Sequence, residues 1–235
     1  MPHPQQLSPD DISLALTESS YPALLLDLLK TSEKYFGVRW RHFPHTINYT
    51  WIAAGLSDLS EGARVLEIGA GANPLPFYLA DRGVTVDTVD NSDVPRRLPP
   101  DESWNEWGFL DYGLLHPSIT SYNLSVTDFE PGEKYDAIYS VSVLSHMPSP
   151  LRKAMLKRCR DWLKPGCRLM KAIDLIPNTD WLWNKGGSNE TPEQHGTFQT
   201  VEGELNSLGF AISESRTQRN VRKSRTDLHF LTANT

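Results

Sequence analysis

Residues 64–90 read RVLEIGAGANPLPFYLADRGVTVDTVD, and this stretch decides the fold class. A short apolar run ends in glycine at 64–69, a helical pattern follows at 73–83, and a second predicted strand at 84–90 ends in an aspartate. Short apolar runs separated by a helix are typical of parallel strands buried on both faces. The stretch therefore predicts a β-α-β unit and an α/β fold.

The same alternation of strands and helices continues to the C-terminus. We expect strands at 119–126, 135–144, 167–175, 210–216 and 226–233, and helices at 148–164 and 193–208. A long connection at 91–118 separates the second and third strands. The last two strands have no helix between them, which predicts an antiparallel strand at one edge of a mostly parallel sheet.

The first sixty residues precede this pattern and are predicted to be helical. Ser8 before Pro9 and Ser20 before Pro22 are helix start signals, and Gly37 is a stop signal. We therefore divide the chain into an N-terminal helical extension at 1–60 and an α/β domain at 61–235. An aromatic and basic stretch at 38–56 either forms a lid or packs the extension against the domain.

Composition narrows the class of protein. The chain has 235 residues, of which 39% are hydrophobic, and a net charge of −6, which suits one large α/β domain and argues against a nucleic-acid partner. The N-terminus has no signal-peptide pattern and no apolar run is long enough to span a bilayer. Cys159 and Cys167 cannot form a disulfide framework, and no Cys/His cluster predicts a metal site. We expect a cytoplasmic protein without a membrane partner, and no pattern sets an oligomeric state.

Residues that follow the strands are the candidates for ligand binding, because open parallel sheets bind ligands beyond the carboxyl ends of their strands. Glycines there allow a tight turn and a close approach to a ligand, and an acid can accept hydrogen bonds from ribose hydroxyls. An acid beside an aromatic ring suits an adenine. Each feature alone has a structural explanation, such as a tight turn or a loop acid. The candidates are Glu67, Gly69, Ala70, Gly71, Asp90, Asn91, Asp128, Phe129 and Ser140.

The order of these motifs resembles the class I methyltransferase family. VLEIGAGANPLPFYLA resembles its first motif, VDTVD its second, SVTDFEPGEKYDAIYS its adenine-binding region and LKPGCRLM the entry to its fifth strand, over about residues 60–235. The resemblance implies a Rossmann-like, seven-stranded, mostly parallel sheet whose last strand is antiparallel. It also implies S-adenosyl-L-methionine as cofactor, with its methionine end at Glu67, Gly69 and Gly71.

The resemblance further implies that Asp90 holds the ribose, and Asp128 with Phe129 the adenine. One departure is Asn73-Pro74 at the end of the glycine loop, from which we expect a shifted helix start. A nicotinamide-dependent oxidoreductase is the main rival for the fold, but its third fingerprint glycine is replaced by Pro74. A non-catalytic protein that keeps the cofactor fold is the alternative from another class.

Methyl transfer to a hydroxyl requires a base, and histidine is the usual one. His146 follows the fourth strand and Asp174 ends the fifth, so we expect Asp174 to orient His146 as the catalytic base. The structural alternative is that His146 caps a helix or packs under a pocket rim. His45 and His195 are further candidates for the base, although we expect His195 to be exposed.

Aromatic and basic side chains could complete an acceptor site. Trp40, Trp104 and Trp107 are expected nearest the acceptor, with Trp181 and Trp183 as further candidates, and packing is the alternative for all of them. The basic residues at 216–225 form a solvated hairpin or a clamp for an anionic acceptor. The sequence predicts an enzyme that O-methylates a small molecule such as a sugar or secondary metabolite. An amine acceptor is the alternative.

Overall fold

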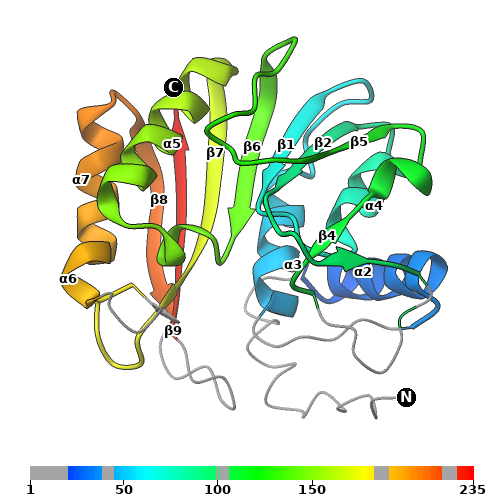
Figure 1. Cartoon of the computed structure of the whole chain (residues 1–235), viewed down its shortest axis with the longest axis horizontal. Helices are drawn as coiled ribbons and strands as arrows, with labels where there is room; N and C mark the ends of the chain where they lie inside the picture. The colour runs from blue at the N-terminus through cyan, green and yellow to red at the C-terminus, as the bar shows by residue number, and fades with distance from the viewer. Residues whose placement is uncertain (1–20, 39–44, 99, 101–105, 183–190, 219–226) are drawn as a thin grey trace. The chain divides into compact units, whose positions relative to one another are not determined.

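The computed structural model describes residues 21–38, 45–98, 100, 106–182, 191–218 and 227–235 (Figure 1). Within this part the chain forms two compact units, residues 1–129 and 130–235, which differ from the division expected at residue 60. That division stays a prediction. Trp40, Trp104, Trp183, the side chain of His45 and most of the basic run lie outside the described residues, as does the first helix start at Ser8.

The first unit contains the glycine-rich stretch and is built on three parallel strands. Its strands are β1 (Arg64–Ile68), β2 (Thr85–Asp90) and β5 (Ile119–Asn123), and its helices are α2 (Tyr21–Phe36), α3 (His45–Gly55) and α4 (Leu75–Ala80). β2 lies between β1 and β5, with Ile68 opposite Val89 and Asp90 opposite Asn123. This register places the ends of β1 and β2 beside each other, as the β-α-β pattern predicts.

The N-terminal helices of this unit are packed elements. α2 ends before Gly37, whose φ of +71° suits a residue without a side chain, so the predicted stop signal is confirmed. In α3, Ile47, Trp51 and Ile52 are buried. The described side chains of α3 are therefore packed, and a lid at 38–56 stays a prediction.

The connection between β2 and β5 contains regular structure that the sequence pattern did not indicate. Two short parallel strands, β3 (Pro95–Arg96) and β4 (Phe109–Leu110), pair with each other, and a 3-10 helix, η1 (Tyr112–Leu114), follows. Strands of two residues are too short to show an alternating pattern, which explains why sequence reasoning treated the segment as a loop.

The second unit carries the remaining strands. These are β6 (Tyr135–Val141), β7 (Leu163–Leu175), β8 (Ala211–Gln218) and β9 (Asp227–Asn234); its helices are η2 (Leu144–His146), α5 (Ser149–Trp162), α6 (Pro192–His195) and α7 (Phe198–Ser207). β6 and β7 are parallel, and β9 runs antiparallel to both β7 and β8. In Figure 1, α5 crosses in front of β7, and α7 lies beside β8.

The strand order confirms the expected fold class and corrects one detail. Seven strands have the order β5-β2-β1-β6-β7-β9-β8, so the sheet is mixed and mostly parallel, and the last strand of the chain is antiparallel. We expected the antiparallel strand at an edge, but β9 inserts between β7 and β8. The apolar run of β9, which is buried along most of its length, explains this central place, whereas the edge strand β8 alternates exposed and half-buried residues.

Several predicted elements differ in their bounds. The strand expected at 135–144 ends at Val141, and the strand expected at 167–175 begins at Leu163. The helix expected at 193–208 is broken into α6 and α7, because Gly196 has a φ of +82° and the Thr197 side chain caps the second helix. The third expected strand ends at Asn123 instead of 126, because residues 125–129 turn, with the Asp128 and Phe129 amides both donating to the Ser125 carbonyl.

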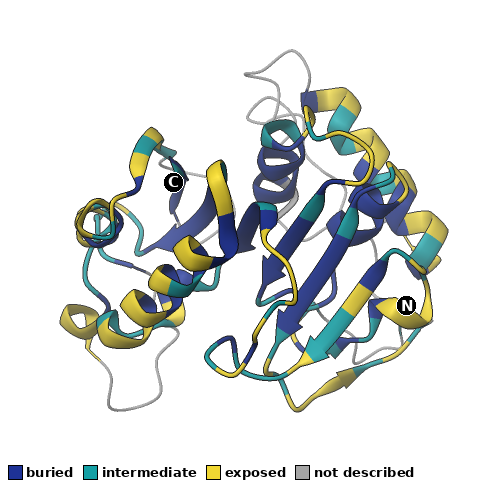
Figure 2. Cartoon of the chain, turned by 90° about the horizontal axis from the view of Figure 1, so that it is seen from above, coloured by how far each residue is buried: buried dark blue, intermediate teal, exposed yellow. Residues whose placement is uncertain are grey.

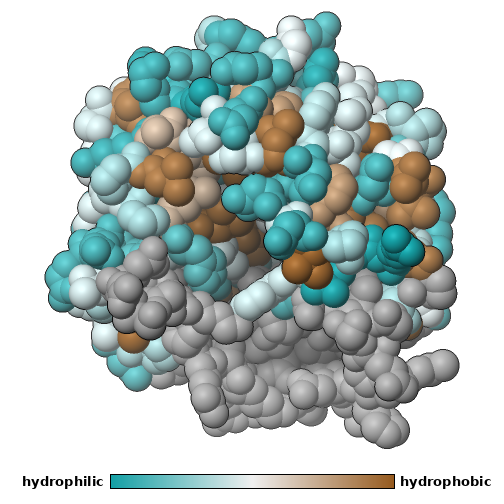
Figure 3. All heavy atoms as spheres, viewed as in Figure 1, coloured by the Kyte–Doolittle hydropathy of each residue, from teal (hydrophilic) through white to brown (hydrophobic). Residues whose placement is uncertain are grey.

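The buried residues of each unit lie mainly in the strands and on the inner faces of the helices (Figure 2). Large hydrophobic side chains that are exposed include Trp107, Leu114 and Val94 of the connection between β2 and β5. On the face seen in Figure 3, hydrophobic residues form separate areas among hydrophilic ones.

Candidate functional site

The loop after β1 has the backbone geometry that its glycines predict. Gly69 has a φ of +68° and Gly71 a φ of +55°, both in the left-handed region. A side chain at Gly71 would collide with the carbonyl oxygen of Glu106, which accepts a hydrogen bond from the Ala72 amide at 2.8 Å. Only glycine meets both requirements at position 71.

Asn73, which departs from the family pattern, is the residue that organises this loop. Its side-chain amide donates to the Ala70 carbonyl at 2.8 Å and to Oε1 of Glu67 at 3.1 Å, and its Oδ1 accepts from the Leu75 amide at 2.8 Å. Asn73 and Glu67 are both buried. The helix start is shifted past Pro74, as expected, and the side chain of Asn73 satisfies one of the free amides of the first helical turn. An asparagine before a proline at a helix start was the available signal for this role.

Asp90 joins the end of β2 to the glycine loop. Its Oδ2 accepts from the Gly71 amide at 2.9 Å and its Oδ1 from the Ser92 amide at 2.8 Å. The Asn123 side chain donates to the carbonyls of Asp90 and Ser92, which fixes the segment that also carries the exposed Asn91. The structure therefore brings together two of the predicted cofactor residues, Gly71 and Asp90. Each carboxylate oxygen keeps further acceptor capacity for a ligand hydroxyl.

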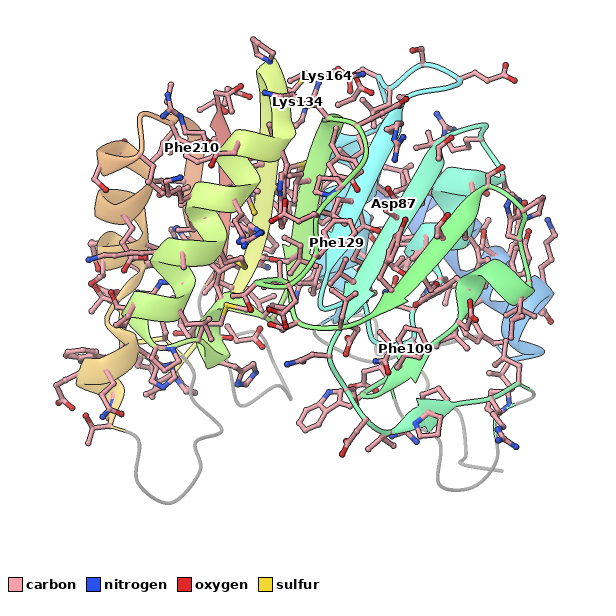
Figure 4. All side chains as sticks on the ribbon, turned by 45° about the horizontal axis from the view of Figure 1, so that its top comes forward. Asp87, Phe109, Phe129, Lys134, Lys164 and Phe210 are labelled. Carbon is pink, nitrogen blue, oxygen red and sulfur yellow. The ribbon has the colours of Figure 1, made fainter. Side chains whose placement is uncertain are left out.

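Asp128 and Phe129 lie in the turn after β5. Asp128 is exposed, whereas Phe129 is buried, with its ring 4.9 Å from that of Tyr122 on β5 (Figure 4). Asp87, also labelled there, points from β2 toward Arg64 and accepts a hydrogen bond from it at 2.8 Å. The binding of adenine by Asp128 and Phe129 stays a prediction.

In the second unit, Ser140 lies inside β6 and is fully buried, opposite Lys171 of β7. Lys171 is fully buried too, and among the described residues neither its Nζ nor the Ser140 hydroxyl has a hydrogen-bond partner. Burial lowers the pKa of Lys171, and the nearby Cys159 thiol opposes this effect. Cys159 is a buried free thiol and Cys167 a half-buried one.

The segment after β6 carries His146 at the end of η2. It begins at Ser142, whose φ of +58° is unusual for a residue other than glycine and is typical of functional sites. His146 is exposed. The carbonyl of Met147, next in the chain, accepts a hydrogen bond from Nη1 of Arg152 at 3.0 Å.

Arg152 is held in turn by a buried acid. Its Nε and Nη2 donate to the two carboxylate oxygens of Glu204 at 2.7 and 2.8 Å, and the Ser149 hydroxyl donates to Glu204 at 2.7 Å. The side chains of Arg152 and Glu204 are 0% and 2% exposed. This pair joins α5 to α7 and anchors the segment that carries His146. Sequence reasoning missed it because the two residues lie on different predicted helices.

Asp174 is buried near the end of β7. β7 is the neighbour of β6, as expected, with Val141 opposite Ala172. The turn after β7 contains Asn178 at a φ of +60°, and its amide donates to the buried Asp227 at 2.8 Å. The orientation of His146 by Asp174 stays a prediction.

The remaining expected acceptor residues have varied environments. His195 is fully buried, so the exposure that we expected for it is wrong. The chain turns back at Gly196, and the Gly196 carbonyl accepts a hydrogen bond from the Leu182 amide at 3.0 Å, which places His195 inside the fold. Trp181 is half-buried and Trp107 is 52% exposed. Arg216 pairs with Glu214 at 2.9 Å and covers the Phe230 ring, so a solvated hairpin accounts for this member of the basic run.

The residues of the first unit fit an adenosyl cofactor by their chemistry. The glycine loop leaves room for close backbone approach, a half-buried carboxylate follows β2, and an acid with an aromatic ring follows β5. In the described ranges, no group of three or more His, Cys, Asp and Glu side chains is arranged to bind a metal ion. No helix of the described part of the chain is long and apolar enough to cross a membrane.

Known proteins share both the sequence pattern and the fold. A family model described as a methyltransferase domain matches residues 40–212. A ubiquinone biosynthesis O-methyltransferase of Pasteurella multocida is 26% identical over 126 residues, which cover 53% of this chain and 51% of that protein. An uncharacterized methyltransferase of Staphylococcus carnosus is 38% identical over 101 residues, 39% of this chain and 46% of that protein. The chain thus spans about half the length of these curated relatives.

Solved structures with the same fold are also methyltransferases. The 1,6-didemethyltoxoflavin-N1-methyltransferase of Burkholderia thailandensis, solved with S-adenosylhomocysteine, has a TM-score of 0.58 at 17% identity, over 98% of this chain and 91% of that chain. The magnesium protoporphyrin IX methyltransferase of Synechocystis, with bound S-adenosylmethionine, has a TM-score of 0.57 at 16% identity, over 97% and 99%. The chain belongs to the methyltransferase-domain family, and this membership confirms the expected enzyme class and its cofactor, S-adenosyl-L-methionine, at the level of the family.

Proposed function

We propose that the chain transfers the methyl group of S-adenosyl-L-methionine to an oxygen atom of a small molecule. The observation that carries the proposal is the hydrogen bond from the Gly71 amide to Asp90, which joins the glycine loop to the acid after β2. These are the two features by which a ribose and the amino-acid end of an adenosyl cofactor are recognised. We further propose that the protein acts in the cytoplasm.

The bound cofactor supplies an electrophilic methyl group on a sulfonium sulfur. Glu67, Gly69, Ala70, Gly71, Asp90 and Asn91 would hold its methionine and ribose parts, Asp128 and Phe129 its adenine, and Ser140 is a further candidate. The protein contributes mainly by holding two reactants in line, which can accelerate a displacement greatly.

An oxygen acceptor also loses a proton, and His146 is our candidate to receive it. Exposure of His146 lets an imidazole nitrogen reach an acceptor hydroxyl and afterwards release the proton to water. The buried Asp174 on the neighbouring strand would orient the ring and stabilise its charged form. The named O-methyltransferase relatives support an oxygen acceptor.

An amine acceptor is the second candidate, supported by the N-methyltransferases among the solved structures with this fold. An uncharged amine attacks through its own lone pair, so it needs no strong base. A protein that binds the cofactor without turnover is the alternative from another class.

Calorimetry with S-adenosylhomocysteine and with NADH tests the cofactor. We expect one S-adenosylhomocysteine per chain and no competition by NADH. Tight NADH binding without a signal for S-adenosylhomocysteine would overturn the proposal. Transfer of a labelled methyl group to panels of phenols, sugars and amines then distinguishes oxygen from nitrogen acceptors, and no transfer to any panel favours the non-catalytic alternative.

A further inference from the structure

We propose that Tyr112 is a positioning residue of the cofactor loop: its hydroxyl holds residues 71–73 in the conformation that binds the cofactor. Tyr112 lies at the start of η1, in the connection between β2 and β5. The inference deepens the proposed function and rests on the cofactor site described above.

The Tyr112 hydroxyl contacts backbone groups of Gly71 and Asn73 in the loop. It accepts a hydrogen bond from the Asn73 amide at 2.9 Å, and its proton faces the carbonyl of Gly71 at 3.1 Å and that of Asn73 at 3.3 Å. A hydroxyl has one proton, so it donates to one of these carbonyls at a time while it accepts from the amide. The contacts thus fix backbone groups on both sides of Ala72.

Those backbone groups belong to the part of the loop whose backbone conformation is rare in proteins. Gly71 has a left-handed backbone, and glycine has the largest conformational freedom to lose. Asn73 holds the loop from within through Ala70 and Glu67. Tyr112 holds it from a different segment, about forty residues along the chain, and therefore fixes the loop against the rest of the unit.

Tyr112 is itself fixed by a chain of part-buried hydrogen bonds. Its amide donates to the Ser121 hydroxyl on β5 at 2.9 Å, and that hydroxyl also accepts from Thr88 on β2 at 3.0 Å. Its ring is fully buried, 5.0 Å from that of Phe77 on α4. Because two strands and a helix fix the position of Tyr112, its hydroxyl can hold the loop in one conformation.

The same environment keeps the hydroxyl protonated. Burial raises the pKa of Tyr112 well above its usual value, and the negative charge of Glu67 adds to this effect. The hydroxyl therefore remains a donor at any pH at which the protein works. A loop already held in its binding conformation avoids the entropy loss of ordering it when the cofactor binds.

The matched pair Tyr112→Phe and Tyr35→Phe tests this role. Both rings lie against Phe77, Tyr35 at 4.0 Å, but the Tyr35 hydroxyl donates to Asp81 at 2.7 Å and does not touch the loop. Removing the Tyr112 hydroxyl should weaken S-adenosylhomocysteine binding about tenfold, the typical contribution of one hydrogen bond in a buried site. Tyr35→Phe should leave the dissociation constant within about twofold of wild type, since an exposed contact away from the site contributes little.

Calorimetry with S-adenosylhomocysteine gives the affinities, and thermal unfolding shows that both variants are folded. A folded Tyr112→Phe with wild-type affinity would overturn the proposal. If Tyr112→Phe does not fold, Ser121→Ala replaces it, because it removes the acceptor of the Tyr112 amide. Weaker binding by this variant then supports the proposal, and unchanged binding overturns it.

Amide hydrogen exchange separates this role from the proposed function. If the wild-type chain binds no S-adenosylhomocysteine, the proposed cofactor is wrong, but the Asn73 amide still reports on Tyr112. Faster exchange of that amide in Tyr112→Phe than in wild type supports the positioning role, whereas equal exchange rates overturn it.

Discussion

The two units of the chain stabilise their functional segments in different ways. In the first unit the loop after β1 depends on backbone geometry and on neutral donors, above all Asn73 and Tyr112. In the second unit the segment after β6 depends on a buried ion pair, Arg152–Glu204. Neutral hydrogen bonds cost little to bury when they are satisfied, whereas buried charges are costly unless every one is paired. The segment after β6 is therefore anchored by an ion pair, whereas in the loop after β1 the carboxylates of Glu67 and Asp90 accept hydrogen bonds from uncharged amides.

The two units also have different proposed roles, since the first binds the cofactor and the second carries the base. The largest expected effect on activity comes from replacing the base, His146. His146→Ala should lower the rate of transfer to an oxygen acceptor by about 100- to 10,000-fold, the usual contribution of a general base. Asp174→Asn should lower it less, because an amide can still hold the imidazole but cannot stabilise its charge. Steady-state rates with an acceptor found by label transfer measure both.

Cofactor affinity is the control for His146→Ala, since the cofactor residues of the first unit are untouched. The wild-type rate should fall when acid protonates the imidazole, and this dependence should be absent from the variant. A fully active variant would move the base elsewhere or indicate an amine acceptor. A variant that has lost cofactor binding would show a structural role.

The buried ion pair should give the largest effect on stability. Glu204→Ala leaves the Arg152 guanidinium buried without its carboxylate and should lower the free energy of unfolding by about 3–5 kcal/mol. The matched control is Asp161→Ala, which breaks the exposed pair with Lys157 on the same helix as Arg152 and should cost less than about 1 kcal/mol. Urea unfolding measures both, and equal losses would show that burial of the Arg152–Glu204 pair does not make it more important than an exposed pair.

A substitution of Asp90 tests the proposed cofactor site of the first unit. Asp90→Ala removes the acceptor of the Gly71 and Ser92 amides and the proposed ribose ligand, and should weaken S-adenosylhomocysteine binding by about 1–3 kcal/mol. Asp93→Ala, at an exposed position three residues further along, is the control and should bind normally. A folded Asp90→Ala with unchanged affinity would place the ribose elsewhere.

Sequence patterns predicted the first strands and the glycine turn of the first unit, and there is a physical reason for this. A strand that is buried along most of its length, such as β1, needs a mainly apolar run, and the turn after β1 needs glycine at position 71. These requirements act on neighbouring residues, so they leave a local signal. Asn73 before Pro74 left such a signal too, although the family pattern did not explain it.

The residues that sequence reasoning missed depend on contacts between distant segments. Tyr112 meets the glycine loop and Arg152 meets Glu204 only after the chain has folded, and neither pair has a characteristic spacing. The burial of His195 follows from the turn at Gly196 rather than from its polar neighbours in the sequence. The central place of β9 depends on pairing with two strands, one of which lies about sixty residues earlier.

Lys171 gives a smaller effect that depends on pH. Burial lowers its pKa in the folded chain, so between that pKa and 10.5 the unfolded chain binds more protons and the stability of the folded chain rises with pH. Lys171→Met has no titrating group at this position, so its free energy of unfolding lacks this dependence. We expect the variant to be more stable than wild type, and the difference between their free energies of unfolding should shrink toward pH 10.5 by at most about 1.4 kcal/mol per pH unit. Unfolding from pH 7 to 10 measures the difference, with the exposed Lys164→Met at the opposite end of β7 as control (Figure 4). A constant difference between Lys171→Met and wild type would mean that Lys171 is charged in the folded chain.

The smallest expected effect concerns Asp81, which forms a largely exposed ion pair with Lys34 in the first unit. Burial opposes the ionisation of Asp81, but hydrogen bonds from Lys34 and Tyr35 outweigh it, so the pKa of Asp81 is lowered from 3.8. The Lys34 and Asp81 side chains are 58% and 31% exposed, and a pair of this kind contributes little because water screens it. Asp81→Asn should therefore lower the free energy of unfolding by less than about 1 kcal/mol at pH 7. The lowered pKa means that this contribution is complete above pH 3.8 and is lost as the pH falls through the folded value, so urea unfolding of variant and wild type should converge in acid. A loss as large as that of Glu204→Ala would show that exposure does not weaken this pair.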